Sequence, residues 1–215
     1  MDEITTIQKF AIWVLPVLFG ITVHEAAHGW VASLLGDNTA RKLGRLTVNP
    51  IKHIDPIGTL LVPGLTFALG GIMFGWAKPV PVNFGKLRNP KRDMALVALA
   101  GPLSNLGMAI VWALLAKVAV IIAYDPISVP LMYMCGPGVF FNMVLMVLNL
   151  LPIPPLDGGR IMTGILPGKY AMYFSRIEPY GLLILVLLIT TGLLGDIIGS
   201  PIHLAYRALM DLVSL

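Results

Sequence analysis

Charged residues are scarce in this chain. Lysine, arginine, aspartate and glutamate make up 12% of its 215 residues, whereas 57% are hydrophobic. An ordinary soluble domain is about 25% charged, because charged side chains cover much of the surface that faces water. The low charge and a mean hydropathy of +0.84 exclude a soluble globule, and the high apolar content excludes a disordered chain. The composition therefore predicts an integral membrane protein.

Cysteine is nearly absent as well, since Cys135 is the only one in the sequence. A single cysteine excludes an intramolecular disulfide and any Cys-x-x-Cys zinc site. The net charge of +4 would also suit a nucleic-acid binder, but in a membrane protein an excess of basic residues typically marks the cytoplasmic loops. We therefore expect a lipid bilayer around this protein and no nucleic-acid partner.

Long apolar stretches indicate where the chain crosses the bilayer. A spanning helix needs about 20 apolar residues, and on this basis we expect four spans, at about 8–35, 94–122, 131–156 and 179–199. The acidic leader Met1-Asp2-Glu3, with no Ala-x-Ala cleavage pattern after it, favours a retained first helix over a signal peptide. Since no long linker interrupts the sequence, residues 1–215 are expected to form one all-α membrane-embedded domain.

Basic residues distinguish two kinds of connecting segment. The basic segments are 36–55, 77–93 and 157–178, and the segments without a base are 123–130 and 192–200. Because cytoplasmic loops carry the excess of lysine and arginine, the basic segments are expected inside the cell and the other two outside. We therefore predict a multi-pass protein of the cell membrane.

The apolar stretch 56–77 has basic segments on both sides, which a simple spanning helix cannot satisfy. Its Pro63-Gly64 and Gly70-Gly71 pairs favour a re-entrant or broken segment, which membranes tolerate where it is buried against protein or lines a cavity. A full span with a basic outer loop is the alternative. The tail 201–215 predicts an amphipathic helix at the membrane interface.

Two polar loops have strand character. Residues 45–49 are rich in β-prone side chains, and residues 77–83 alternate with a period of two. Pro79 and Pro81 would confine the second loop to the edge of a sheet, because proline has no N–H to donate. We therefore expect a helix bundle that carries short β-prone loops on its cytoplasmic side.

Ionisable residues inside an apolar helix are candidates for function. The first predicted helix contains the run His24-Glu25-Ala26-Ala27-His28. Two histidines four residues apart lie about 40° apart around a helix, so both imidazoles face one point, which is typical of a metal site. Glu25 can reach a water on the same metal as a general base. The alternative is a buried His–Glu cluster without a metal.

A catalytic zinc ion takes three protein ligands and one water. The candidates for the third ligand are Asp157, Asp55, His53 and His203. Asp157 is favoured, because the third predicted span reaches the cytoplasmic side there, at the expected depth of His24, and the glycines after it allow close approach. His53 and Asp55 lie in a loop at the same face and could support the ligands or contact substrate. His203 is expected near the opposite face.

Three asparagines, Asn105, Asn142 and Asn149, lie in apolar helices. For Asn142 we favour a structural hydrogen bond between helices. Asn149 precedes the proline-rich run 151–155, which frees backbone groups beside the expected metal, and it could bind a substrate carbonyl. The candidates for substrate binding are therefore Asn149, Asn105 and His53.

Taken together, these motifs resemble those of the site-2 proteases, the intramembrane zinc metalloproteases. The residues that carry the resemblance are 24–29 (HEAAHG), 101–105 (GPLSN) and 149–158 (NLLPIPPLDG), in this order within apolar stretches. The resemblance implies that His24, His28 and Asp157 bind Zn²⁺, that Glu25 activates the water and that Asn149 lies near the substrate backbone.

The resemblance also bears on the loops and on domain content. Residues 75–83 are similar to a stretch found in the compact branch of the family, and would clamp an extended substrate by strand addition. The sequence has no room for a PDZ or CBS domain, so substrate filtering or nucleotide control of those kinds is not expected.

The expected function is therefore that of a zinc metallopeptidase in regulated intramembrane proteolysis. It would cleave a transmembrane protein or peptide, with its active site toward the cytoplasmic side of the cell membrane. An inactive scaffold would not need Glu25, and a metal transporter would need ionisable groups along a whole path, yet no histidine or acid occurs within 94–116 or 126–156. A zinc-dependent membrane hydrolase of a non-protein substrate would use the same chemistry and stays an alternative.

Overall fold

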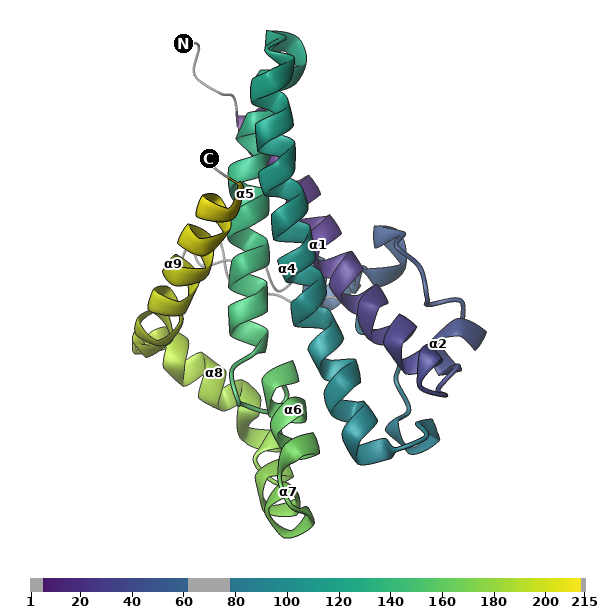
Figure 1. The fold of residues 1–215 in the computed structure, drawn as a ribbon. Coiled ribbons are helices and arrows are strands. Elements are labelled where there is room, and N and C mark those ends of the chain that lie inside the picture. Colours follow the sequence, from purple (N-terminus) through teal and green to yellow (C-terminus); the bar gives the residue numbers. More distant parts are fainter. Residues whose placement is uncertain (1–5, 62–77, 214–215) are drawn as a thin grey trace.

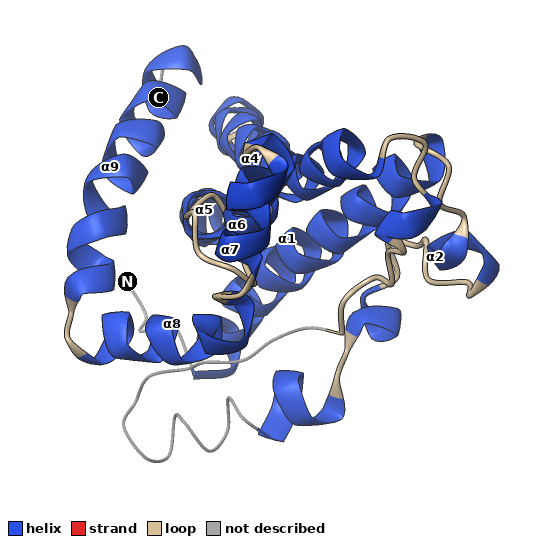
Figure 2. Cartoon of the chain, turned by 90° about the horizontal axis from the view of Figure 1, so that it is seen from below, coloured by secondary structure: helices blue, strands red, loops and turns tan. Residues whose placement is uncertain are grey.

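The computed structural model describes residues 6–61 and 78–213, and every regular element in these ranges is a helix. Figures 1 and 2 show these helices as an elongated bundle. The expected all-α class is thus confirmed for the described residues. No strand forms over 45–49 or 78–83, because the backbone N–H groups of Lys78, Val80 and Asn83 donate to groups outside any strand.

Three long helices form the centre of the bundle: α1 (Thr6–Leu34), α4 (Pro90–Ile122) and α5 (Asp125–Asn149). α4 and α5 run antiparallel, and Ala123, in the left-handed conformation with φ 48°, closes the turn between them. α1 packs against both of these helices. Gly138 allows α5 to approach α4 closely, since a Cβ there would lie 2.4 Å from the Trp112 ring.

Four helical segments are long and apolar enough to span a membrane: Ile12–Leu34, Pro90–Ile122, Asp125–Asn149 and Gly168–Thr190. This supports the expectation of a multi-pass membrane protein. The predicted third span, 131–156, differs at both ends, since α5 begins at Asp125 and ends at Asn149. The prolines at 152, 154 and 155 explain the earlier end, because proline cannot continue the helical hydrogen bonds.

The predicted helix over 179–199 is divided into two in the structure. α8 (Gly181–Thr190) ends before Gly192, and α9 (Leu193–Val213) begins after it. Gly192 has φ 78°, a left-handed conformation that glycine adopts without strain, so the chain turns within an apolar stretch. The predicted tail helix at 201–215 is therefore the second half of α9. Its Leu209 is buried in a cluster with Cys135 and Val139 of α5. α9 lies on the side of α5 opposite α1 (Figures 1 and 2).

The connecting segments contain short helices. They are α2 (Thr39–Lys42), η1 (Pro50–His53), η2 (Pro56–Leu61), η3 (Phe84–Lys86), α6 (Asp157–Ile165), α7 (Gly168–Ser175) and η4 (Glu178–Tyr180). The stretch 56–77 begins with η2, and its residues 62–77 lie outside the described residues. Whether this stretch re-enters or spans the membrane therefore stays a prediction.

The loop after α5 folds back tightly on α6. A Cβ at Gly158 would lie 2.2 Å from the Leu151 carbonyl oxygen, and one at Gly159 would lie 2.5 Å from the Pro154 nitrogen. Only glycine leaves room for so close an approach of two backbones. The two glycines therefore fix the position of the preceding residue, Asp157, relative to the end of α5.

Candidate metal centre

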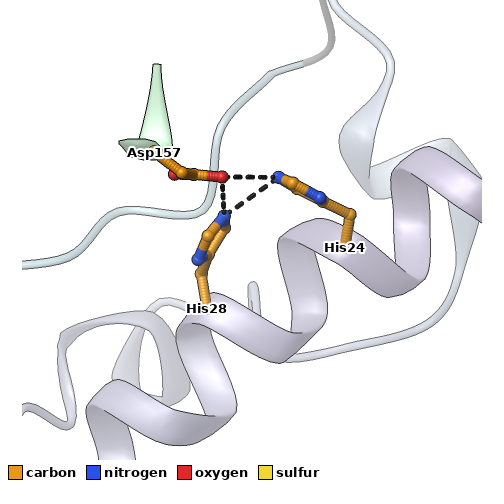
Figure 3. A group of neighbouring side chains, drawn as sticks. All are labelled: His24, His28 and Asp157. Carbon is orange, nitrogen blue, oxygen red and sulfur yellow. Dashed lines mark hydrogen bonds and ion pairs between the residues drawn. The ribbon is translucent and has the colours of Figure 1, made fainter. Parts of the chain in front are cut away.

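Three buried side chains converge between α1 and the start of α6. The Nε2 atoms of His24 and His28 lie 3.0 Å apart, and each lies 3.2 Å from Oδ2 of Asp157 (Figure 3). The residues are 8%, 8% and 6% exposed, so bulk water reaches none of them freely. The predicted pair on one helix face and the predicted third ligand therefore meet at one point.

The dimensions of this triangle fit a zinc ion. Ligand atoms about 2.0–2.2 Å from a tetrahedral zinc lie roughly 3.3 Å from one another, close to the spacing observed here. Two imidazole nitrogens and one carboxylate oxygen are also a ligand set that zinc accepts, with the fourth position left for water. Among the described residues, these three form the group of histidine and acidic side chains whose ligand atoms lie close enough together to bind one metal ion.

α4 binds the Nδ1 atom of each histidine, on the side of the ring away from the expected metal. Nδ1 of His24 lies 2.6 Å from Oδ1 of Asn105, and Nδ1 of His28 lies 2.7 Å from the Val97 carbonyl oxygen. When Nδ1 donates its proton to such an acceptor, Nε2 keeps its lone pair for a metal. Two nitrogen lone pairs and a carboxylate oxygen then face one another in a buried space, an arrangement that a cation stabilises.

Gly101 explains why α4 can support the two rings so closely. A Cβ at this position would lie 2.5 Å from Cε1 of His24 and 2.5 Å from Nε2 of His28. Contacts this short do not occur for real side chains, so any larger residue would displace the imidazoles. The glycine of the 101–105 motif therefore has a direct role in shaping the metal centre.

The three ligands line a cavity with a volume of about 330 Å³, and Glu25 lines it as well. Its Oε2 accepts a hydrogen bond of 2.7 Å from the Val80 backbone N–H. No other hydrogen bond to this carboxylate is found among the described residues, so Oε1 is available to a bound molecule. The carboxylate is therefore held at one oxygen and open at the other, and its role as a base stays a prediction.

Residues 78–84 form one wall of the cavity, here called the Val80 wall. Its side chains in the cavity are those of Pro79, Val80, Val82 and Phe84. Arg45 holds one end, because its Nη2 lies 3.1 Å from the Lys78 carbonyl oxygen and 3.3 Å from that of Pro79. Gly29 on α1 leaves space for Val80, since a Cβ there would lie 2.7 Å from Cγ1 of Val80.

Asp37 holds the other end of the Val80 wall. Its Oδ2 accepts a 2.6 Å hydrogen bond from the Asn83 N–H, and its Oδ1 accepts from the backbone and hydroxyl of Thr39. Burial alone would raise the pKa of this carboxyl, but the hydrogen bonds from Thr39 and Asn83 and the charge of Lys86 outweigh burial and hold the pKa below its usual value. The ionised carboxylate is therefore part of the folded structure.

The predicted substrate-binding residues occupy three different positions. Asn149 is half-buried and lines the cavity, and its contact with substrate stays a prediction. Asn105 is fully buried and its Oδ1 contacts Nδ1 of His24. It therefore has no exposed surface that a substrate could contact. His53 is buried outside the cavity, where its Nε2 lies 2.9 Å from the Thr47 carbonyl oxygen and its own carbonyl accepts from Lys78.

The other candidates for the third ligand lie apart from the metal centre. Asp55 accepts hydrogen bonds from the N–H groups of Ile57 and Gly58 at the start of η2. His203 is exposed on α9. Neither belongs to the group of ligand atoms that includes Asp157.

Two features of the site were not predicted from the sequence. Arg160 lines the cavity, with its guanidinium 5.5 Å from the centre of the Phe84 ring. Its position three residues after Asp157 was the available signal, since i and i+3 share a helix face. The bond between Val80 and Glu25 left no such signal, because it joins residues 55 apart in sequence.

Comparisons with known proteins give evidence on the family that is independent of this geometry. The model of the family described as "Peptidase family M50" matches residues 128–191. The chain is 36% identical over 207 residues to "Putative zinc metalloprotease YwhC" of Bacillus subtilis (strain 168), covering 94% of this chain and 90% of that protein. It is 30% identical over 198 residues to "Putative zinc metalloprotease Rip2" of Mycolicibacterium smegmatis, covering 90% and 73%.

A third relative and the solved structures complete the comparison. "Putative zinc metalloprotease Rip2" of Mycobacterium tuberculosis (strain H37Rv) is 36% identical over 141 residues, which cover 66% of this chain and 52% of that protein. No solved structure matches the chain. The extent of the match to the first two relatives decides the family, and the resemblance inferred from the motifs is confirmed. The chain belongs to peptidase family M50, the site-2 proteases, and is a zinc metalloprotease of that family.

Proposed function

We propose that this protein is an intramembrane endopeptidase that hydrolyses peptide bonds of membrane-spanning proteins. The observation that carries the proposal is the convergence of His24, His28 and Asp157 beside the free carboxylate oxygen of Glu25. A hydrolase needs this combination, because a metal site without an adjacent base binds but does not activate a nucleophile efficiently. The four apolar helical segments place that chemistry in a membrane protein.

His24, His28 and Asp157 would hold Zn²⁺. When bound, zinc would supply a Lewis acid that lowers the pKa of a coordinated water toward about 7 and polarises a substrate carbonyl. Glu25 accepts the proton of the attacking water at Oε1 and then delivers it to the leaving amine. Meanwhile the Val80 N–H holds Oε2, so the carboxylate keeps one orientation during both proton transfers.

The Val80 wall and Asn149 suit an extended peptide. On the wall, Val80 N–H is bound to Glu25 and Asn83 N–H to Asp37, whereas Val82 N–H has no partner among the described contacts. A substrate segment in β-conformation would accept a bond from Val82 N–H, as in strand addition. The side chain of Asn149 lines the cavity and would bind the substrate backbone. A transmembrane helix would have to unwind locally to take this conformation.

The proposed location of the site is the cytoplasmic half of the cell membrane. α4 begins at Pro90, beside Lys91 and Arg92, and it contacts the histidines through Val97, Gly101 and Asn105. At 1.5 Å per residue, Val97 lies about 10 Å from the basic end of this helix. Basic helix ends face the cytoplasm in most membrane proteins, which supports entry of water and substrate from that side.

The test is cleavage of a transmembrane peptide by purified protein and by the variant Glu25→Gln. The variant should bind zinc like the parent, because Glu25 is not a ligand, and should lose about 10²–10⁴-fold in cleavage rate. Glu178→Gln, at an exposed glutamate of η4, is the matched control and should cleave at the parental rate.

Each other outcome has a definite meaning. Full cleavage by Glu25→Gln would contradict the assignment of the base. Zinc binding without cleavage of any peptide, together with Glu25-dependent hydrolysis of a lipid or a small molecule, would favour the alternative of a membrane hydrolase with a non-protein substrate. Zinc binding without any hydrolysis would favour an inactive scaffold.

A further inference from the structure

We infer that Asn105 and Asn142 form a hydrogen-bonded relay whose role is to fix the ring of His24 for metal binding. The relay rests on the metal-binding part of the proposed function. It begins at the Gly138 carbonyl on α5, passes through Asn142 to Asn105 on α4 and ends at His24 on α1. The neighbouring helices α4 and α5 are thereby joined to a ligand on the first helix, α1.

The polarity of the relay follows from its two backbone ends. The Gly138 carbonyl oxygen can only accept, so Asn142 directs its Nδ2 toward it, at 2.8 Å. Asn142 therefore presents Oδ1 to Asn105, whose Nδ2 lies 3.0 Å from it and 3.2 Å from the Gly20 carbonyl oxygen. Because both of these groups accept, the amide of Asn105 cannot be turned around.

The same logic determines which nitrogen of His24 carries the proton. With Nδ2 of Asn105 committed, Oδ1 faces Nδ1 of His24 at 2.6 Å, and this oxygen can only accept. Nδ1 must therefore be protonated, and the lone pair of Nε2 points to His28 and Asp157. The backbone of α5 and α1 thus selects the metal-binding form of His24 through two asparagine side chains.

Burial makes the relay difficult to replace by solvent. Asn105 and Asn142 are both 0% exposed, so water cannot substitute for either amide. Gly20 makes room for the second asparagine, since a Cβ there would lie 3.0 Å from Oδ1 of Asn142. His28 differs, because its Nδ1 is held by the Val97 backbone carbonyl. His24 is therefore the histidine whose support depends on side chains.

The competing interpretation is that the two asparagines only hold the helices together. Interhelical asparagine bonds stabilise membrane bundles generally. The two roles differ in what they change. A structural bond affects unfolding alone, whereas a relay affects the affinity for the metal even in a protein that remains folded.

The experiment measures zinc affinity of purified protein in detergent by competition with a chelator, and thermal unfolding of the metal-free form. The variants are Asn105→Leu, which removes the contact to His24, and Asn142→Leu, which removes the relay one step away. Met143→Ala is the matched control, because Met143 is also 0% exposed on α5 but has no place in the relay. The Co²⁺-loaded proteins are compared by their visible absorption, which reports ligand geometry.

The relay predicts a loss of about 10- to 100-fold in zinc affinity for Asn105→Leu, with a changed Co²⁺ spectrum. Asn142→Leu should weaken binding in the same direction by a smaller factor. Met143→Ala should unfold at a lower temperature and keep the parental affinity and spectrum.

Unchanged affinity in both asparagine variants would overturn the relay, and so would an equal loss in Met143→Ala. If Asn105→Leu does not fold, Asn142→Leu and Asn105→Ser decide the question by the same affinity measurement. A parent protein that binds no zinc would overturn the proposed function and also the relay, which rests on metal binding. These outcomes separate the two proposals, because none of them depends on peptide cleavage.

Discussion

At the scale of single residues, the metal centre depends on the absence of side chains as much as on its ligands. Gly101 lies directly behind both imidazoles, and Gly158 and Gly159 allow the loop after α5 to place Asp157. The ligands alone would not converge if these positions carried a Cβ. These glycines are therefore required for metal binding, because they leave the space in which the ligands converge.

Gly101→Ala tests this conclusion. The new Cβ would lie 2.5 Å from atoms of His24 and His28, so the rings must move and zinc affinity should fall at least tenfold. Gly107→Ala is the matched control on α4, because its Cβ would meet no atom within 4 Å. That variant should bind zinc normally and gain about 0.5–1 kcal/mol of stability. Equal zinc affinity of the two variants would contradict the proposed packing.

Asp37 predicts a pH dependence of stability. Its pKa is lower in the folded protein than in the unfolded chain, so it stabilises the fold fully above about pH 4 and loses this contribution as pH falls through the lowered folded pKa. Asp37→Asn should therefore be destabilised by about 1–2 kcal/mol at pH 7, and the difference should become smaller as pH falls from 5 to 3. Thermal unfolding of both proteins at pH 7, 5 and 3 measures this difference. If the difference in stability between the two proteins is the same at all three pH values, the ionised Asp37 carboxylate does not stabilise the Val80 wall.

At the scale of elements, α4 supports the metal centre without supplying a ligand. It provides Asn105 for His24, the Val97 carbonyl for His28 and the space at Gly101. The ligands themselves come from α1 and from the start of α6 (Figure 3). The motif at 101–105 is thus explained by contacts with α1.

The Val80 wall is the second element on which function depends. Arg45 and Asp37 hold its two ends, and between them Val80 reaches Glu25. Because both ends are attached to the loops that follow α1, the wall keeps a fixed distance from the metal centre. This arrangement makes Arg45 a positioning residue for the base.

Arg45→Gln should loosen the wall and leave the ligands in place. We expect zinc content to be unchanged and the cleavage rate to fall about ten- to a hundredfold, since small displacements of a catalytic group have large effects. Arg41→Gln, at an exposed arginine of α2, is the control and should cleave normally. Cleavage assays with metal analysis on the same preparations provide the measurement. Loss of zinc together with activity would mean that Arg45 supports the whole site.

At the scale of the whole molecule, the metal would link parts of the chain that are far apart in sequence. His24 and His28 belong to the first helix, whereas Asp157 follows the third of the apolar segments. α6, which begins with Asp157, also packs against α4, and α4 packs against α1, so a metal held by α1 and α6 would complete a closed set of contacts among the three helices. Metal binding should therefore stabilise the bundle as a whole.

Removal of zinc tests this linkage. A ligand present at a thousandfold its dissociation constant stabilises the folded state by about 4 kcal/mol. A chelator should accordingly lower the unfolding temperature of the parent and of Glu25→Gln alike, and the temperature should recover when zinc is restored. Asp157→Ala should show a much smaller response to the chelator. If the chelator has the same effect on Asp157→Ala as on the parent, zinc does not act at this site.

Much of this protein can be predicted from its sequence, because the relevant signals are local. Sparse charge and long apolar stretches indicate a multi-pass membrane protein, and the spacing of His24 and His28 places both rings on one face of a helix. The order of the three motifs was sufficient to indicate the family. Each of these inferences depends on composition or on short motifs that are read along the chain.

Only the tertiary structure decided how these parts meet. The bond between His24 and Asn105 joins residues 81 apart, and that between Val80 and Glu25 joins residues 55 apart. Such contacts depend on how helices pack, which hydropathy does not encode, so Asn105 was expected at the substrate and lies behind a ligand. The turn at Gly192 was missed for a related reason, since the apolar character continues through it while the backbone changes direction. Local patterns therefore determined the class of protein and its reactive residues, and packing between distant helices determined their geometry.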